Sequence, residues 1–182
     1  LISPNAKGKQ KHAAVVMFAQ SGKAKLLEHR AGVIASLLDS GVAVCLPDLR
    51  GTGETAPSNY RGRRSYATGI SSSELMLGQT LVGSRLKDLR TVLAVLRKRE
   101  DVDAARIAIW GDSLADVNGP NDPVDVPLGI DYEPKRSEPL GQMLALLAGL
   151  YEEDVAAVVA ARGGLPGFGA TLESGACHFP HD

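Results

Sequence analysis

Four short runs that are almost free of polar side chains constrain the fold of this chain more than any other feature. They occupy residues 13–19, 42–46, 106–110 and 155–160. None of them alternates between polar and apolar residues, as a half-exposed strand would. Continuous apolar strands are typical of a parallel sheet that is covered on both faces. The sequence therefore predicts a doubly wound, mostly parallel α/β sheet.

Apolar residues recur at helical spacing between these runs, within residues 26–38, 82–96 and 140–150. Gly41 is expected to end the first of these helices. Ser71 and Glu74 have the spacing of a capping box, so a helix start is expected there. Strands that alternate with helices indicate crossover connections between parallel strands.

The bulk composition limits the possible partners. The 182 residues have the size of one domain, and we expect a single domain over residues 1–182. Twenty Lys and Arg against 21 Asp and Glu give a net charge of -1. This balance gives no electrostatic reason to expect nucleic acid or an anionic membrane as a partner.

No metal or cofactor motif is found. Cys45 lies in an apolar run, which favours a buried thiol over a disulfide.

The run Gly111-Asp112-Ser113-Leu114-Ala115 directly follows the third predicted strand. It is close to the Gly-x-Ser-x-Gly turn in which a serine nucleophile sits between a strand and a helix, with alanine in place of the last glycine. The flanking residues must be small because other backbone passes close by. Ser113 is therefore the predicted nucleophile. The backbone N–H of Leu114 is the predicted donor to a substrate oxyanion.

The turn after the first strand is the second candidate segment. The carboxyl ends of parallel strands face the same ligand crevice, so Gln20-Ser21-Gly22 is expected to lie beside Ser113. The backbone N–H of Ser21 is then a second oxyanion donor, although a plain strand-to-helix turn would have the same composition. We interpret the glycine-rich loop 48–53 as structural, with Asp48 and Arg50 in internal ion pairs.

Several stretches together resemble the α/β-hydrolase superfamily, in particular its acetyl xylan esterase-like and dienelactone hydrolase-like members. The resemblance implies a Ser–His–Asp hydrolase that acts on small acyl esters, including acetyl groups on plant cell-wall sugars. It implies no cofactor. The sequence assigns no compartment, and only the resemblance suggests secretion. The matching stretches are LPDLRGTGET (46–55), ELMLGQTLVGSRLKDLR (74–90), RIAIWGDSLA (106–115), EPLGQMLALLAGLYEEDV (138–155) and ARGGL (161–165).

The chain departs from this family pattern after the serine. In the superfamily the acid and the histidine follow the nucleophile on loops behind later strands. Here only one predicted strand follows, so we expect both groups to lie outside this chain and the hydrolase core to lack its C-terminal strands. The histidine candidates within the chain are His178 and His181, and a surface position is expected for both. We also expect Asp112, Asp116 and Asp182 to be solvated.

Two other functions share the same residues. A serine peptidase of the prolyl-oligopeptidase kind has the same nucleophile turn and a similar Asp-x-Arg-Gly loop. A non-catalytic binding domain with the hydrolase fold would explain the missing acid and histidine. Without further strands, the fourth predicted strand would be a bare apolar edge, for which we expect self-association or a complementary segment.

Overall fold

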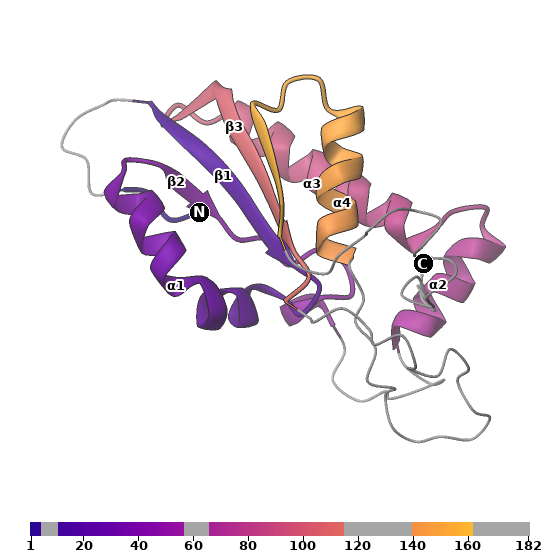
Figure 1. The fold of residues 1–182 in the computed structure, drawn as a ribbon. Coiled ribbons are helices and arrows are strands. Elements are labelled where there is room, and N and C mark those ends of the chain that lie inside the picture. Colours follow the sequence, from indigo (N-terminus) through magenta and orange to yellow (C-terminus); the bar gives the residue numbers. More distant parts are fainter. Residues whose placement is uncertain (5–10, 57–65, 115–139, 162–182) are drawn as a thin grey trace.

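The computed structural model describes residues 1–4, 11–56, 66–114 and 140–161, and every structural statement below concerns these residues. Strands and helices alternate along the chain (Figure 1). The elements are β1 (His12–Ala19), α1 (Lys23–Asp39), β2 (Ala43–Cys45), the short 3-10 turn η1 (Gly53–Thr55), α2 (Tyr66–Met76), α3 (Leu81–Arg97), β3 (Val102–Asp112), α4 (Leu140–Tyr151) and β4 (Ala157–Ala161).

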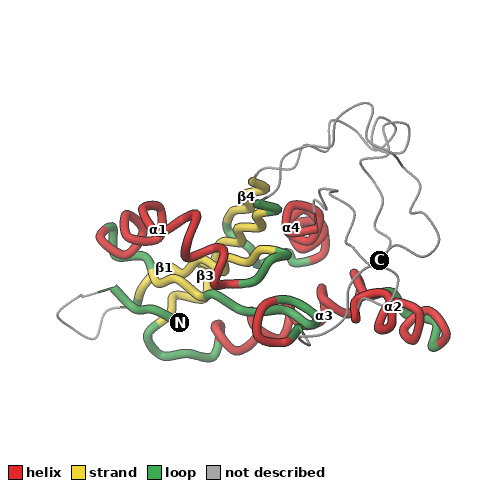
Figure 2. Tube along the Cα trace, turned by 90° about the horizontal axis from the view of Figure 1, so that it is seen from below, coloured by secondary structure: helices red, strands yellow, loops and turns green. Residues whose placement is uncertain are grey.

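The four strands form one sheet in the order β2-β1-β3-β4, and all their pairings are parallel. Helix α1 covers one face, and helices α3 and α4 cover the other (Figure 2). The predicted doubly wound α/β fold is confirmed. The chain steps from β1 to β2 in one direction and then returns to β3 on the far side of β1. The strand order therefore reverses between β1 and β3.

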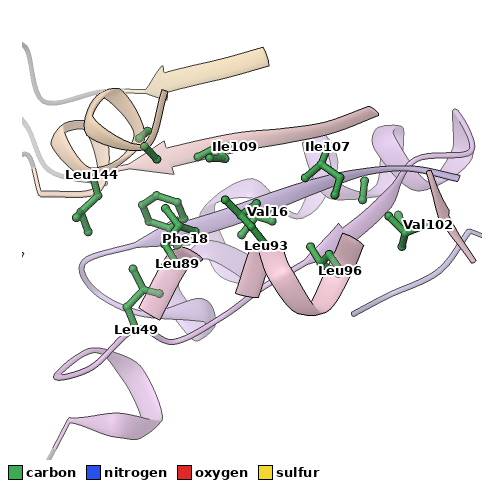
Figure 3. Close-up of a cluster of buried hydrophobic side chains, with 14 of the residues drawn as sticks. Val16, Phe18, Leu49, Leu89, Leu93, Leu96, Val102, Ile107, Ile109 and Leu144 are labelled. Atoms are coloured by element: carbon green, nitrogen blue, oxygen red, sulfur yellow. The ribbon is translucent and has the colours of Figure 1, made fainter. Parts of the chain in front are cut away.

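Strand β1 shows why its sequence lacks alternation. Val16 and Phe18 point to the face covered by α3 and α4, where they pack with apolar side chains of α3 and β3 (Figure 3). Val15 and Met17 point to the opposite face and pack against α1. Both sets are almost fully buried, so both faces of the strand require apolar residues.

The predicted capping box at Ser71 and Glu74 is wrong. Ser71 lies inside α2, and α3 starts at Leu81 after the N-cap residue Thr80, whose side chain accepts a hydrogen bond from the Gly83 N–H at 3.0 Å. Gly78, with φ of +72°, lies between the two helices in a left-handed conformation that glycine adopts without strain. The sequence thus encodes two helices where the capping pattern suggested a helix start at Ser71.

The third strand is longer than residues 106–110. Strand β3 begins at Val102, which pairs with His12 of β1 before a register irregularity, and it continues to Asp112. The strand therefore includes residues 102–105, which precede the apolar run. The register with β1 passes from His12–Val102 to Ala14–Ile107, so residues 103–106 form the irregular part of the strand.

Strand β4 is an edge strand among the described elements, because β3 is the neighbour with which it pairs. Val158 and Val159 on it remain partly exposed.

Cys45 is a free thiol, half-buried at the end of β2, and burial raises its pKa. Within the described ranges, no helix has both the length and the apolar character required to cross a membrane.

The loop after β2 is held by ion pairs, as predicted, although Asp48 and Arg50 do not pair with each other. Arg50 binds the Asp88 carboxylate through Nε and Nη2, at 2.9 and 2.8 Å. Its Nη1 donates to Glu74 on α2 at 2.9 Å. Arg50 thereby joins the loop to α2 and α3.

We expect acid to weaken the attachment of α2 through Glu74. Hydrogen bonds from Ser84 and Arg50 hold the pKa of Glu74 below its ordinary value of 4.5. A lowered pKa stabilises the folded state above the unfolded pKa, and this stabilisation is lost as pH falls through the folded pKa. Below about pH 4.5 the free energy of unfolding should therefore fall faster in the wild type than in Glu74→Gln, measured by urea unfolding. Glu153→Gln, at an exposed position, is the control, and equal acid sensitivity in wild type and Glu74→Gln would contradict the prediction.

Candidate active site

Ser113 lies at the point where the strand order reverses. It directly follows β3, and the register pairs Ala19 at the end of β1 with Asp112 at the end of β3. Strands β1 and β3 end side by side (Figure 1). Gln20 and Ser113, the residues that follow this pair, therefore leave neighbouring strands at the same end of the sheet. In open α/β sheets this position is the crevice in which ligands bind. The structure thus brings together the two segments that the sequence singled out.

The turn at Ser113 has an unusual backbone. Leu114 has φ of +51° and is the non-glycine residue with positive φ in the described part of the chain. A left-handed conformation costs a side-chain-bearing residue about 1 kcal/mol or more, so the surrounding contacts must hold it in place. The Ser113 N–H donates to the Ala161 carbonyl at 3.3 Å, which continues the sheet contact with β4. Ser113 itself is buried, with 2% of its surface exposed.

The Leu114 N–H, the predicted oxyanion donor, donates to Asp112 Oδ1 at 3.0 Å. A side chain that accepts from the amide two residues later forms a compact turn, which accounts for the sharp change of direction here. A substrate oxygen must replace Asp112 Oδ1 before this amide can stabilise an oxyanion.

Helix α4 begins directly against this turn. A Cβ atom on Gly111 would overlap the carbonyl of Gly141, and a Cβ on Gly141 would overlap the carbonyl of Asp112. The Leu140 N–H at the start of α4 donates to Gln20 Oε1 at 3.2 Å. The positive end of the helix dipole therefore lies beside the end of β3, where it favours negative charge.

The expectation that Asp112 is solvated is wrong. Its side chain is fully buried and forms an ion pair with Arg30, with 2.6 Å between Nε and Oδ2. Ala108 and Trp110 face α1, and Asp112 follows them in the same alternation along the strand. Asp112 is thus directed to the face that α1 covers. This period of two was the signal in the sequence that would have placed Asp112 inside.

Helix α1 is kinked where it supplies the partner of Asp112. Arg30 has φ of −123° and ψ of 16°, outside the helical range. Its side chain is largely buried, with 19% exposed. Sequence reasoning did not identify Arg30, because an arginine in an amphipathic helix is ordinarily on the solvated face.

Contacts with the loop after β2 hold the turn after β1 in place. Asp48 accepts hydrogen bonds from the Lys23 N–H at 2.6 Å and from the Glu54 N–H at 3.0 Å. Gly22 has φ of +84°, and a Cβ there would overlap the backbone of Gly53. Ser21 is exposed at the start of this turn. Its predicted role as an oxyanion donor stays a prediction.

The two histidines in the described part of the chain are not placed to serve Ser113. His12 starts β1, at the opposite edge of the sheet, where its Nδ1 lies 3.2 Å from the Gly41 carbonyl oxygen. His29 is exposed on α1. The histidine candidates His178 and His181 lie outside the described residues, as do Ala115, Asp116 and Asp182. Across the described ranges, no three His, Cys, Asp or Glu side chains are grouped as metal ligands.

A cavity of about 480 Å³ opens at the other end of the sheet, between Arg97, Ala104 near the start of β3, and Val155 before β4. Because the strands are parallel, this cavity and Ser113 lie at opposite edges. It takes no part in the site described above.

Comparison with known proteins supports the fold. No protein-family model and no curated protein matches the chain. A solved structure described as a putative acetyl xylan esterase from Bacteroides fragilis resembles it, with a TM-score of 0.51 and 17% sequence identity. The likeness covers 62% of this chain and 34% of that protein, so the chain matches about a third of its length. At this identity the likeness establishes the shared α/β fold.

Proposed function

We propose that the chain carries the nucleophile of a serine carboxylic ester hydrolase and that this nucleophile is Ser113. The observation that carries the proposal is the pairing of Ala19 with Asp112, which sets Ser113 beside the β1 turn at the reversal of strand order. The position of this serine, at the carboxyl end of a central parallel strand and next to the strained Leu114, supports the proposal of a nucleophile elbow.

The proposed reaction has two steps. Ser113 Oγ attacks the ester carbonyl carbon, its proton passes to a histidine base, and the alcohol leaves with that proton as the carbon–oxygen bond breaks. Water then attacks the acyl-serine and releases the carboxylic acid. The base and its acid partner would come from residues beyond the described ones. The N–H groups of Leu114 and Ser21 would stabilise the oxyanion, with the substrate oxygen replacing Asp112 Oδ1 at Leu114.

The proposed substrates are small or carbohydrate esters with an acetyl group. The resemblance of stretches such as RIAIWGDSLA (106–115) to acetyl xylan esterase-like hydrolases supports this class. The solved structure with the same fold, described as a putative acetyl xylan esterase, also supports it.

The test is covalent labelling of the full-length natural protein that contains this sequence. A fluorophosphonate probe is expected to modify Ser113, located by peptide mapping, and Ser113→Ala should abolish the label. Ser36→Ala is the matched control, because Ser36 is exposed on α1 and donates to Gly32 there. A folded wild-type protein that takes up no probe, or a label that survives Ser113→Ala, would overturn the proposal.

A non-catalytic binding domain is the second candidate, favoured by the hydrogen bond that occupies the Leu114 N–H. The labelling test separates it from an enzyme. A serine peptidase of the prolyl-oligopeptidase kind would label as well, and paired assays on acetyl esters and aminoacyl amides distinguish it. Faster turnover of the amides would assign the chain to the peptidases.

A further inference from the structure

We propose that Arg30 is a positioning residue for Ser113 and acts through the carboxylate of Asp112. The inference rests on the proposed hydrolase function and adds to that site a residue of helix α1, far upstream of the serine in the chain. Arg30 touches no substrate in this proposal. It fixes the backbone turn that presents the nucleophile.

The two oxygens of one carboxylate connect α1 to the nucleophile turn. Arg30 Nε binds Asp112 Oδ2 at 2.6 Å, and the Leu114 N–H binds Oδ1 at 3.0 Å. With both oxygens engaged, the carboxylate cannot rotate without breaking one of the two contacts. The direction of the Leu114 N–H is therefore tied to the position of the Arg30 side chain.

Burial makes Asp112 depend on its partner. Its side chain has no exposed surface, and a buried carboxylate without a counter-charge is strongly unfavourable. Without Arg30, Asp112 either takes up a proton or turns toward water. Both responses weaken its hold on the Leu114 amide, because a carboxylate accepts hydrogen bonds more strongly than a neutral group does.

The strain at Leu114 explains why this hold matters for the reaction. Leu114 remains at φ of +51° only while surrounding contacts enforce it, and the Asp112 hydrogen bond is one such contact. If the turn relaxes, Ser113, which lies between the two residues joined by this hydrogen bond, is no longer held in position to attack the ester carbonyl. A misplaced nucleophile raises the barrier of the chemical step and leaves substrate binding largely unchanged, so kcat should fall while KM changes little.

The kink in α1 fits this role. The helix departs from helical geometry at Arg30 itself, the residue whose side chain reaches Asp112. Exposed Lys25 on the same helix pairs with the exposed Glu28 at 2.7 Å. Lys25 therefore provides a matched control cation on α1 that has no connection to the turn.

The test uses the full-length protein with Arg30→Met, Arg30→Lys and the control Lys25→Met. We expect Arg30→Met to lower kcat on p-nitrophenyl acetate about 100-fold, as a misplacement of the reacting group by about 1 Å does, with KM within about twofold. The kcat of Arg30→Lys should lie between that of the wild type and that of Arg30→Met, since an ammonium keeps the charge but lacks the planar fork of the guanidinium. Lys25→Met should equal the wild type.

The double variant Arg30→Met/Asp112→Asn distinguishes positioning from folding. The amide oxygen introduced by Asp112→Asn can still accept the Leu114 N–H but needs no counter-charge, so kcat should recover to within about tenfold of the wild type. A double variant as slow as Arg30→Met, or a wild-type kcat in Arg30→Met, overturns the inference while the hydrolase proposal stands.

Hydrogen–deuterium exchange of the peptide that contains Leu114 needs no activity. Exchange in this peptide should be faster in Arg30→Met than in the wild type and should slow again in the double variant, with β1 unchanged. Unchanged exchange in Arg30→Met overturns the inference, whether or not the protein hydrolyses esters. A wild-type protein that fails to label at Ser113 overturns the hydrolase proposal, and with it the catalytic role given to Arg30.

Discussion

Replacing Gly111 by alanine is expected to lower the free energy of unfolding by about 3 kcal/mol, because the added methyl group has no space. Its Cβ would lie 2.6 Å from the carbonyl carbon of Gly141 at the start of α4 and would overlap the attached oxygen. Both neighbours are backbone, so no flexible side chain can move aside. Leu140 and Leu144 hold α4 in the core beside β3, which prevents the helix from retreating cheaply.

Urea unfolding of Gly111→Ala and of the control Gly32→Ala measures this effect. A Cβ at Gly32 in α1 would have no neighbour within 4 Å. Alanine is a better helix former than glycine, so the control should gain up to about 1 kcal/mol. Equal stability of the two variants would show that α4 does not press against β3 at Gly111.

Replacing Ser113 by alanine is expected to lower ester turnover by a factor of about 1,000 or more, because the members of a nucleophile–base pair act as a unit. The free energy of unfolding should change by no more than about 1 kcal/mol, the net value of an ordinary hydrogen bond. The hydroxyl is small, and the backbone contact of Ser113 with Ala161 does not involve it. A large loss of rate without a large loss of stability is the combination that marks a nucleophile.

Initial rates on p-nitrophenyl acetate, with denaturant unfolding of the same samples, check both parts of this prediction. Ser36→Ala removes a hydroxyl that donates to the Gly32 carbonyl on the exposed side of α1, and it should leave the rate unchanged. If Ser113→Ala kept the turnover of the wild type, another group would have to carry the reaction.

Local pattern in the sequence determined the elements and their faces. The apolar runs predicted the strands β1 to β4. Strand β1 shows the reason, because a strand covered on both sides needs apolar side chains in both directions. The GDSLA run (111–115) directly after such a strand located the candidate nucleophile turn. These features are readable because each depends on residues that are close together in the chain.

Only the tertiary structure decided which segments meet. The order β2-β1-β3-β4 sets the β1 turn beside Ser113, and α4 closes on Gly111. The pair Arg30–Asp112 joins residues far apart in the chain, and without a visible partner the charged Asp112 was expected in water, although it is fully buried. Periodicity records whether a residue is covered, and it carries no information about which distant residue covers it. For that reason the sequence identified Ser113, and the fold was needed to show what holds it in place.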